Sequence, residues 1–99
     1  MFPKEQSLVV LDLSQVEDSD LMKRLATNDL AAWSELVKRY AKIVYSISFQ
    51  IINNNSDAED AMQNTFMRMK LYANKFDRTQ PLRPWLSRIA SGEAIRIYN

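Results

Sequence analysis

The sequence has no cysteine and no histidine among its 99 residues, and it has a single glycine. Without cysteine, the chain cannot form a disulfide framework, an iron–sulfur cluster or a thiolate zinc site. Without histidine, it lacks the commonest general base and the commonest metal ligand, so only carboxylates are left for acid–base chemistry. The sequence therefore gives little support for an enzyme, and we expect no bound metal or cofactor.

Long apolar runs are also missing. No segment reaches the stretch of about 20 apolar residues that spans a bilayer, and the N-terminus lacks the pattern of a signal peptide. These absences predict a soluble, cytoplasmic protein without a membrane partner. With 46% hydrophobic residues, the chain is long enough for one modest core and too short for two domains.

Apolar residues recur at helical spacing in four segments, which predicts an all-α fold, a compact bundle of three to four helices. A short first helix is expected after a cap at Asp18 or Ser19, and it ends at the turn-forming Asn28. Asp29 then caps a longer helix that stops at Asn53, the first of three asparagines, because asparagine side chains compete for backbone hydrogen bonds.

Specific residues also indicate where the third and fourth helices begin. Ser56 with Glu59 forms a capping box, so a helix should begin at Ser56 and run to about Asn74. The last helix should begin near Leu82, because the prolines on either side of this position favour a helix start. Its later apolar positions fall out of phase with the earlier ones, which predicts a break or phase slip at Gly92. The alternative is that the last turn leaves the core.

The N-terminal residues form a separate segment. Residues 7–13 are apolar enough for a short strand, but the sequence has no second strand pattern to pair with it. We therefore expect residues 1–17 to form an N-terminal arm or to be disordered. The helical domain is then residues 18–99.

The predicted third helix carries a polar stripe opposite its apolar one. Winding at 3.6 residues per turn places Asp57, Asp60 and Asn64 together, with Gln63 beside them. Acidic residues also favour the positive end of the helix dipole, so a solvated helix start is the alternative interpretation of this stripe.

Charge is distributed unevenly along the chain, although the formal net charge is only +1. Residues 1–60 carry ten acidic against six basic side chains, whereas residues 61–99 carry two against seven. A basic half of this kind is typical of a phosphate-binding surface, because clustered cations attract a polyanion and release its counterions. The sequence thus indicates two partners of opposite charge.

Several short motifs follow one another along the chain at characteristic spacings. They are Asp20-Leu21, Asn28-Asp29, Ala31-Ala32-Trp33, Leu36, Arg39-Tyr40, Asp57-Ala-Glu-Asp60, Gln63, Phe66, Phe76-Asp77, Pro81-Leu-Arg83 and Trp85-Leu-Ser-Arg-Ile-Ala90. With these motifs the chain resembles, over about seventy positions, region 2 of the extracytoplasmic-function (ECF) sigma factors. These proteins are promoter-recognition subunits of bacterial RNA polymerase. The partners that the resemblance implies are core polymerase, promoter DNA and an anti-sigma factor.

The resemblance implies that the helix from Ser56 docks on the coiled-coil clamp helices of the polymerase's largest subunit. The docking positions are Asp57, Asp60, Gln63 and Asn64. Carboxylates and amides suit this role because they accept hydrogen bonds from arginine side chains. The family usually has an acidic residue where this chain has Asn64, which weakens or retunes the expected docking.

The resemblance also implies that the following loop and helix read the promoter's minus-ten element as it opens, and that the loop captures an unstacked non-template base. Such capture recovers the free energy of unstacking through stacking and hydrogen bonds. Phe76 is the candidate stacking residue, although both Phe76 and Trp85 have an alternative role in the core, favoured for Trp85. The candidate DNA-binding residues are Lys75, Phe76, Asp77, Arg78, Thr79, Gln80, Arg83, Arg88 and Arg96.

Two further departures from the family concern the end of the chain. Gly92 stands where the family commonly has asparagine, and residues 93–99 lack the usual basic run. No segment resembles the second sigma domain, the helix-turn-helix that reads the minus-35 element. The chain is therefore interpreted either as an excised domain or as a short protein.

Two other function classes fit parts of the sequence. A sigma-like adaptor that binds only polymerase or an anti-sigma factor would need the acidic stripe and no base reader. An enzyme would need Asp57, Glu59 and Asp60 to hold magnesium or activate water, but three carboxylates near one helix start make a weak metal site.

Overall fold

The computed structural model describes residues 12–99 of the chain, which contain helices and no strand. The elements are α2 (Asp18–Leu25), α3 (Leu30–Ile52), α4 (Asn55–Leu71), the 3-10 helix η1 (Ala73–Lys75) and α5 (Leu82–Tyr98). The predicted all-α bundle is confirmed. Among these helices, none is both long and apolar enough to cross a membrane.

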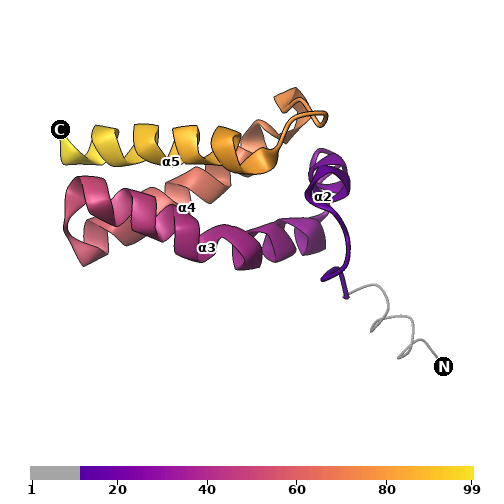
Figure 1. Cartoon of the computed structure of the whole chain (residues 1–99), viewed down its shortest axis with the longest axis horizontal. Helices are drawn as coiled ribbons and strands as arrows, with labels where there is room; N and C mark the ends of the chain where they lie inside the picture. The colour runs from indigo at the N-terminus through magenta and orange to yellow at the C-terminus, as the bar shows by residue number, and fades with distance from the viewer. Residues whose placement is uncertain (1–11) are drawn as a thin grey trace.

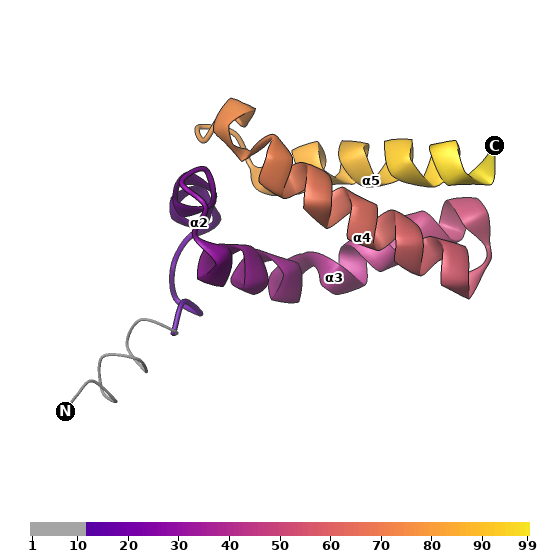
Figure 2. The same cartoon turned by 180° about the vertical axis from the view of Figure 1, so that it is seen from behind.

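The three long helices pack against one another, and α2 crosses one end of the group (Figure 1). Figure 2 shows α4 lying across α3 and α5, with the α3–α4 turn and the C-terminus at the end opposite to α2. The loop after η1 lies at the α2 end. This arrangement brings α2 into contact with η1, which comes much later in the chain.

Local signals set the ends of α3. The Asp29 carboxylate accepts hydrogen bonds from the backbone N–H groups of Ala31 (3.0 Å) and Ala32 (3.3 Å), which confirms the predicted cap. The helix ends at Asn53, whose φ of 58° is left-handed, and the turn before α3 contains Asn28 with a φ of 68°. Both asparagines occupy a region that asparagine tolerates better than most residues.

The predicted capping box at the start of α4 is wrong. The cap is Asn54, whose Oδ1 accepts a hydrogen bond from the backbone N–H of Asp57 at 2.9 Å. Only Asn53 and Asn54 separate α3 from α4, which begins at Asn55. Ser56 therefore lies inside the helix and not at its cap. At the other end, the predicted limit at Asn74 falls within η1 rather than in α4.

The first helix also starts differently from the prediction. Glu17 occupies the cap position of α2 and makes no side-chain cap bond. The expected cap, Asp18, instead binds the Arg39 guanidinium and the Tyr40 hydroxyl of α3. Of the expected N-terminal arm, residues 1–11 lie outside the described part of the chain, whereas Leu13 is 5% exposed and belongs to the core.

The core lies between all four α-helices, and its largest fully buried side chains include Leu21, Met22, Leu25, Leu36, Val44, Met69 and Leu86. Phe66 of α4 is buried, at 3% exposure. Trp33 is only partly buried, and its indole Nε1 donates a hydrogen bond to the Phe66 carbonyl oxygen at 3.0 Å. This bond gives the indole N–H a partner at the edge of the core.

The predicted break at Gly92 is also wrong, because α5 runs without interruption to Tyr98. The helix keeps its phase and buries Glu93, which is 4% exposed. The Glu93 carboxylate pairs with the Arg68 guanidinium of α4, and Arg96 lies 3.7 Å away. A paired carboxylate can be buried at far lower cost than an isolated one, and so the out-of-phase residue does not end the helix.

Candidate functional surfaces

The outer face of α4 carries all four predicted docking residues. Asp60, Gln63 and Asn64 are exposed, and Asp57 is half-buried in the first turn. The side of the helix that faces the core contains Ala58, Ala61, Thr65, Phe66 and Met69. The helical repeat therefore brings the predicted set together on one solvent-facing surface, as the sequence indicated.

In the described part of the chain, the carboxylates of Asp57 and Asp60 on this face form no ion pair that would compete with a binding partner. Within residues 12–99, no three acidic side chains come close enough together to hold a metal ion. The face can accept hydrogen bonds from basic groups of a partner.

The loop between η1 and α5 is a tight, exposed turn. The Asp77 carboxylate accepts hydrogen bonds from the backbone N–H (3.0 Å) and the hydroxyl (2.7 Å) of Thr79, and the Gln80 N–H bonds to the Asp77 carbonyl oxygen (3.0 Å). The two bonds from Thr79, the one from its hydroxyl foremost, hold the pKa of the Asp77 carboxyl below its usual range. Asp77 thus shapes the turn, while Arg78, Thr79 and Gln80 are exposed.

Phe76 lies beneath the turn and not on its surface. It is 7% exposed, and its ring packs against Trp85 with centroids 4.9 Å apart and planes tilted by 53°. Trp85 is partly buried against the core, as predicted. In this conformation Phe76 supports the loop and offers no free face for a base. The groups of the turn that a base can reach are therefore its exposed polar side chains.

A cleft of about 340 Å³ opens between this turn and the junction of α2 with α3. We call it the loop cleft. Its lining includes Asp18, Ser19, Tyr40, Arg78, Thr79, Gln80 and Arg83. A second hollow of about 190 Å³, also lined by Phe76 and Gln80, includes Trp85 and Arg88. The turn therefore projects between two hollows.

Sequence reasoning missed the far wall of the loop cleft, which Asp18 and Tyr40 form. The Tyr40 hydroxyl donates a hydrogen bond to Asp18, and burial together with this bond raises the pKa of Tyr40 to about 12. Tyr40 was part of a family motif and of an apolar stripe, but neither signal places it opposite residues 78–83. Only the packing of α2 and α3 against the loop does so.

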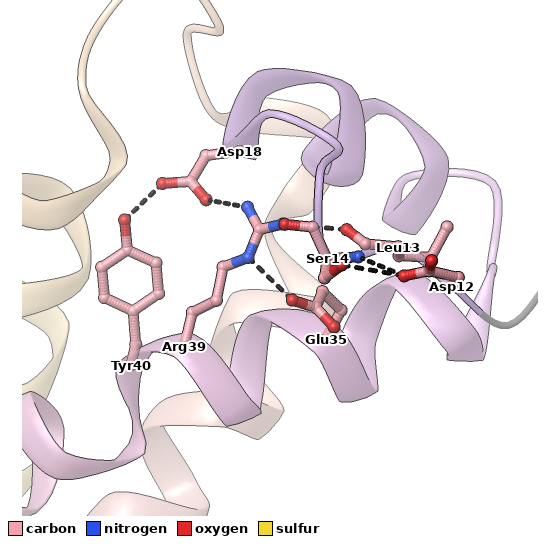
Figure 3. Close-up of polar contacts among 7 residues, drawn as sticks. All are labelled: Asp12, Leu13, Ser14, Asp18, Glu35, Arg39 and Tyr40. Carbon is pink, nitrogen blue, oxygen red and sulfur yellow. Dashed lines mark hydrogen bonds and ion pairs between the residues drawn. The ribbon is translucent and has the colours of Figure 1, made fainter.

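The Arg39 guanidinium holds this wall in place (Figure 3). Its Nε bonds to Glu35 and one terminal nitrogen bonds to Asp18, both at 2.9 Å. Its other terminal nitrogen donates to the carbonyl oxygens of Leu13 (2.9 Å) and Ser14 (3.2 Å). One side chain thereby ties α3 to the start of α2 and to the segment before it.

The predicted phosphate contacts do not form a single cluster. Lys75, Arg83 and Arg88 are exposed on the segments next to the loop. Arg96 lies near the C-terminal end of α5, thirteen residues after Arg83 or about 20 Å along the helix. It belongs to a different surface, which includes Arg68 and Glu93 of the α4–α5 contact.

Comparison with known proteins gives a consistent result. A family model described as sigma-70 region 2 matches residues 36–99. The chain is 38% identical over 74 residues to the ECF RNA polymerase sigma factor SigE of Mycolicibacterium smegmatis, a match covering 67% of this chain and 26% of that protein. It is 28% identical to the ECF RNA polymerase sigma factor SigW of Bacillus subtilis, covering 75% and 40%. The chain thus spans well under half the length of these relatives.

A solved structure supports the same assignment. An engineered region 2 of sigmaE in complex with GTAAAA, determined by NMR, has a TM-score of 0.76 and 29% identity to this chain. The match covers 83% of this chain and 85% of the other. These similarities confirm the predicted resemblance to region 2 of ECF sigma factors. With the family model matching more than half of its residues, the chain belongs to the sigma-70 region 2 family.

Proposed function

We propose that this chain acts in bacterial transcription initiation, in the cytoplasm. The outer face of α4 docks on the coiled-coil clamp helices of core RNA polymerase. The loop cleft and the start of α5 read the non-template strand of the minus-ten element as it opens. The proposal is supported by family membership and by the similar region 2 that was solved with GTAAAA. Sigma factors are initiation factors and not enzymes, in line with the sequence-based expectation.

Docking is proposed for Asp57, Asp60, Gln63 and Asn64. The exposure of Asp60, Gln63 and Asn64, and the lack of ion pairs at Asp57 and Asp60 within residues 12–99, support this role. Carboxylates accept strong, bidentate hydrogen bonds from arginine, and amides add further donors and acceptors. A partner helix with basic side chains therefore fits this face.

Base capture is proposed for the turn over the loop cleft. The exposure of that turn to solvent is the main observation that supports this role. Arg78, Thr79 and Gln80 present donors and acceptors that suit the edge of an unstacked base. Phe76 and Asp77 support the turn from below and from within. We therefore propose that they shape the base-binding site rather than stack on or read the base.

The remaining cations are proposed to hold phosphates along the strand. The exposure of Lys75, Arg83 and Arg88 next to the turn supports this role. Arg96 would contact the same DNA only if the strand or duplex continued along α5. A phosphate contact of Arg96 is therefore expected to matter less for short single strands than for duplex promoter DNA.

The nucleic-acid half is tested by titrating the 99-residue chain with the single strand GTAAAA. Arg83→Ala should weaken binding and reduce its salt dependence, because a lost phosphate contact lowers the slope by about 0.7 for single strands. Arg78→Ala should also weaken binding, because it removes a proposed contact to the base edge. Lys38→Ala, which removes an exposed cation of α3, is the matched control and should leave the slope unchanged. If GTAAAA does not bind even in the presence of core polymerase, the protein-only adaptor is the correct function.

The docking half is tested by pull-down of core polymerase. Asp60→Arg should abolish association, because it places a cation opposite basic clamp side chains, and it should leave the circular-dichroism spectrum unchanged at this exposed position. Unchanged pull-down of core polymerase by Asp60→Arg would show that the docking assignment is wrong.

A further inference from the structure

Two large apolar side chains are exposed on the outer face of α4. Met67 is 58% exposed and Leu71 is 67% exposed. A single exposed apolar residue needs no explanation, whereas these two neighbours on one helix face form a small apolar patch. Neither residue is needed for the bundle, because both point away from the core side of α4.

This apolar pair continues the row of predicted docking residues. Met67 follows Asp60 by seven residues and Leu71 follows Asn64 by seven, which is close to two helical turns in each case. The four side chains therefore line one strip that extends for about 16 Å along the helix. A straight helix laid along α4 can contact the whole strip.

The charge along the strip changes sign from one end to the other. Asp57 and Asp60 stand at its first end, whereas Met67 and Leu71 border a groove of about 500 Å³ between α4 and α5 that also includes Arg68, Lys70 and Arg96. Glu93 pairs with Arg68, but Arg96 keeps 68% of its side chain exposed. This end of the strip is apolar with a basic border.

We propose that Met67 and Leu71 form the apolar anchor of the polymerase-docking surface, and that the partner is a helix of complementary pattern. That helix carries basic side chains opposite Asp57 and Asp60, apolar side chains opposite Met67 and Leu71, and an acidic side chain near Arg96. The proposal depends on the docking function proposed above. It adds that burial of apolar groups supplies much of the affinity, since a few central, well-buried contacts dominate most interfaces.

The test measures the affinity of the 99-residue chain for core RNA polymerase by biolayer interferometry at low and high salt. The double variant Met67→Ala/Leu71→Ala should weaken binding about tenfold or more at both salt concentrations, because apolar contacts are not screened. Leu30→Ala on α3, which removes a leucine that is also 58% exposed, is the matched control and should change binding less than twofold. GTAAAA binding should be unchanged in both variants.

The outcomes separate this inference from the docking function on which it depends. If the double variant binds core polymerase like the unmodified chain while Asp60→Arg does not bind, the apolar anchor is wrong and the docking face stands. If neither variant affects binding, docking through α4 is wrong altogether. If the double variant loses GTAAAA binding but keeps polymerase binding, the apolar pair serves the nucleic-acid surface and the inference is refuted.

Discussion

Replacement of Arg39 by alanine should destabilise the fold by about 2–4 kcal/mol. The guanidinium makes four hydrogen bonds, two to the carboxylates of Asp18 and Glu35 and two to the carbonyl oxygens of Leu13 and Ser14. A hydrogen bond contributes about 0.5–1.5 kcal/mol net, and one between charged groups about 1.5–3 kcal/mol. We discount the sum of these values because Arg39 and Asp18 keep 23% and 30% of their side chains exposed.

The geometry of the guanidinium, and not only its charge, should account for this stabilisation. Arg39→Lys keeps the cation but replaces the planar fork by one ammonium, which cannot reach Asp18, Glu35 and two carbonyl oxygens together. We therefore expect the lysine variant to recover no more than about half of the loss. Lys38→Ala, at the exposed neighbouring position, is the control and should change stability by less than about 0.5 kcal/mol.

Equilibrium unfolding in urea, followed by circular dichroism, measures these differences. A double-mutant cycle between Arg39 and Asp18, and a second between Arg39 and Glu35, separates the two ion pairs. The reasoning would be refuted if Arg39→Ala unfolded within about 0.5 kcal/mol of the unmodified chain, because exposed ion pairs contribute that little.

Three further predictions concern the core, a helix cap and the wall of the loop cleft. Phe66→Ala should cost about 3–5 kcal/mol in urea unfolding, because its buried ring leaves a cavity; a loss under 1 kcal/mol would contradict that burial. Asp29→Ala should cost about 1 kcal/mol at pH 7. The hydrogen bond from Arg24 lowers the pKa of Asp29, so this cost is present above the usual pKa of 3.8 and should shrink in more acidic urea melts; a constant cost would refute the coupling. Burial and the bond to Asp18 raise the pKa of Tyr40 from 10.0 to about 12, so its stabilising effect is complete below pH 10. The stabilisation of the unmodified chain relative to Tyr40→Phe, measured as unfolding free energy, should therefore decrease between pH 10 and 12. A difference that stays constant over this range would count against the raised pKa.

Several features of the fold could be predicted because they depend on neighbouring residues alone. Asp29 caps α3 through backbone groups two and three residues away, and Asn53 ends the same helix by its own conformation. The docking residues of α4 share one face because of the helical repeat, which acts over a few residues. The start of α5 at Leu82 follows from the prolines around it.

The surroundings of the charged side chains could not be predicted in this way. A helical wheel gives the direction of a side chain but not the group that it meets. The helical pattern names no partner for Arg39 or Glu93, whereas the structure pairs these residues with groups of other segments, Asp18 of α2 and Arg68 of α4. The same limit applies to Phe76, because its place in the core depends on its contact with Trp85 of the next helix.

The sequence by itself thus determined the existence of the helices, both ends of α3, the start of α5 and the residue types on each outer face, because these depend on hydrogen bonds and periodicity over a few residues. The tertiary structure alone decided which charges are neutralised, what lines the loop cleft and which apolar side chains stay exposed beside the docking residues. The physical reason is that the cost of burying or exposing a side chain depends on the partner opposite it, and that partner comes from a distant part of the chain.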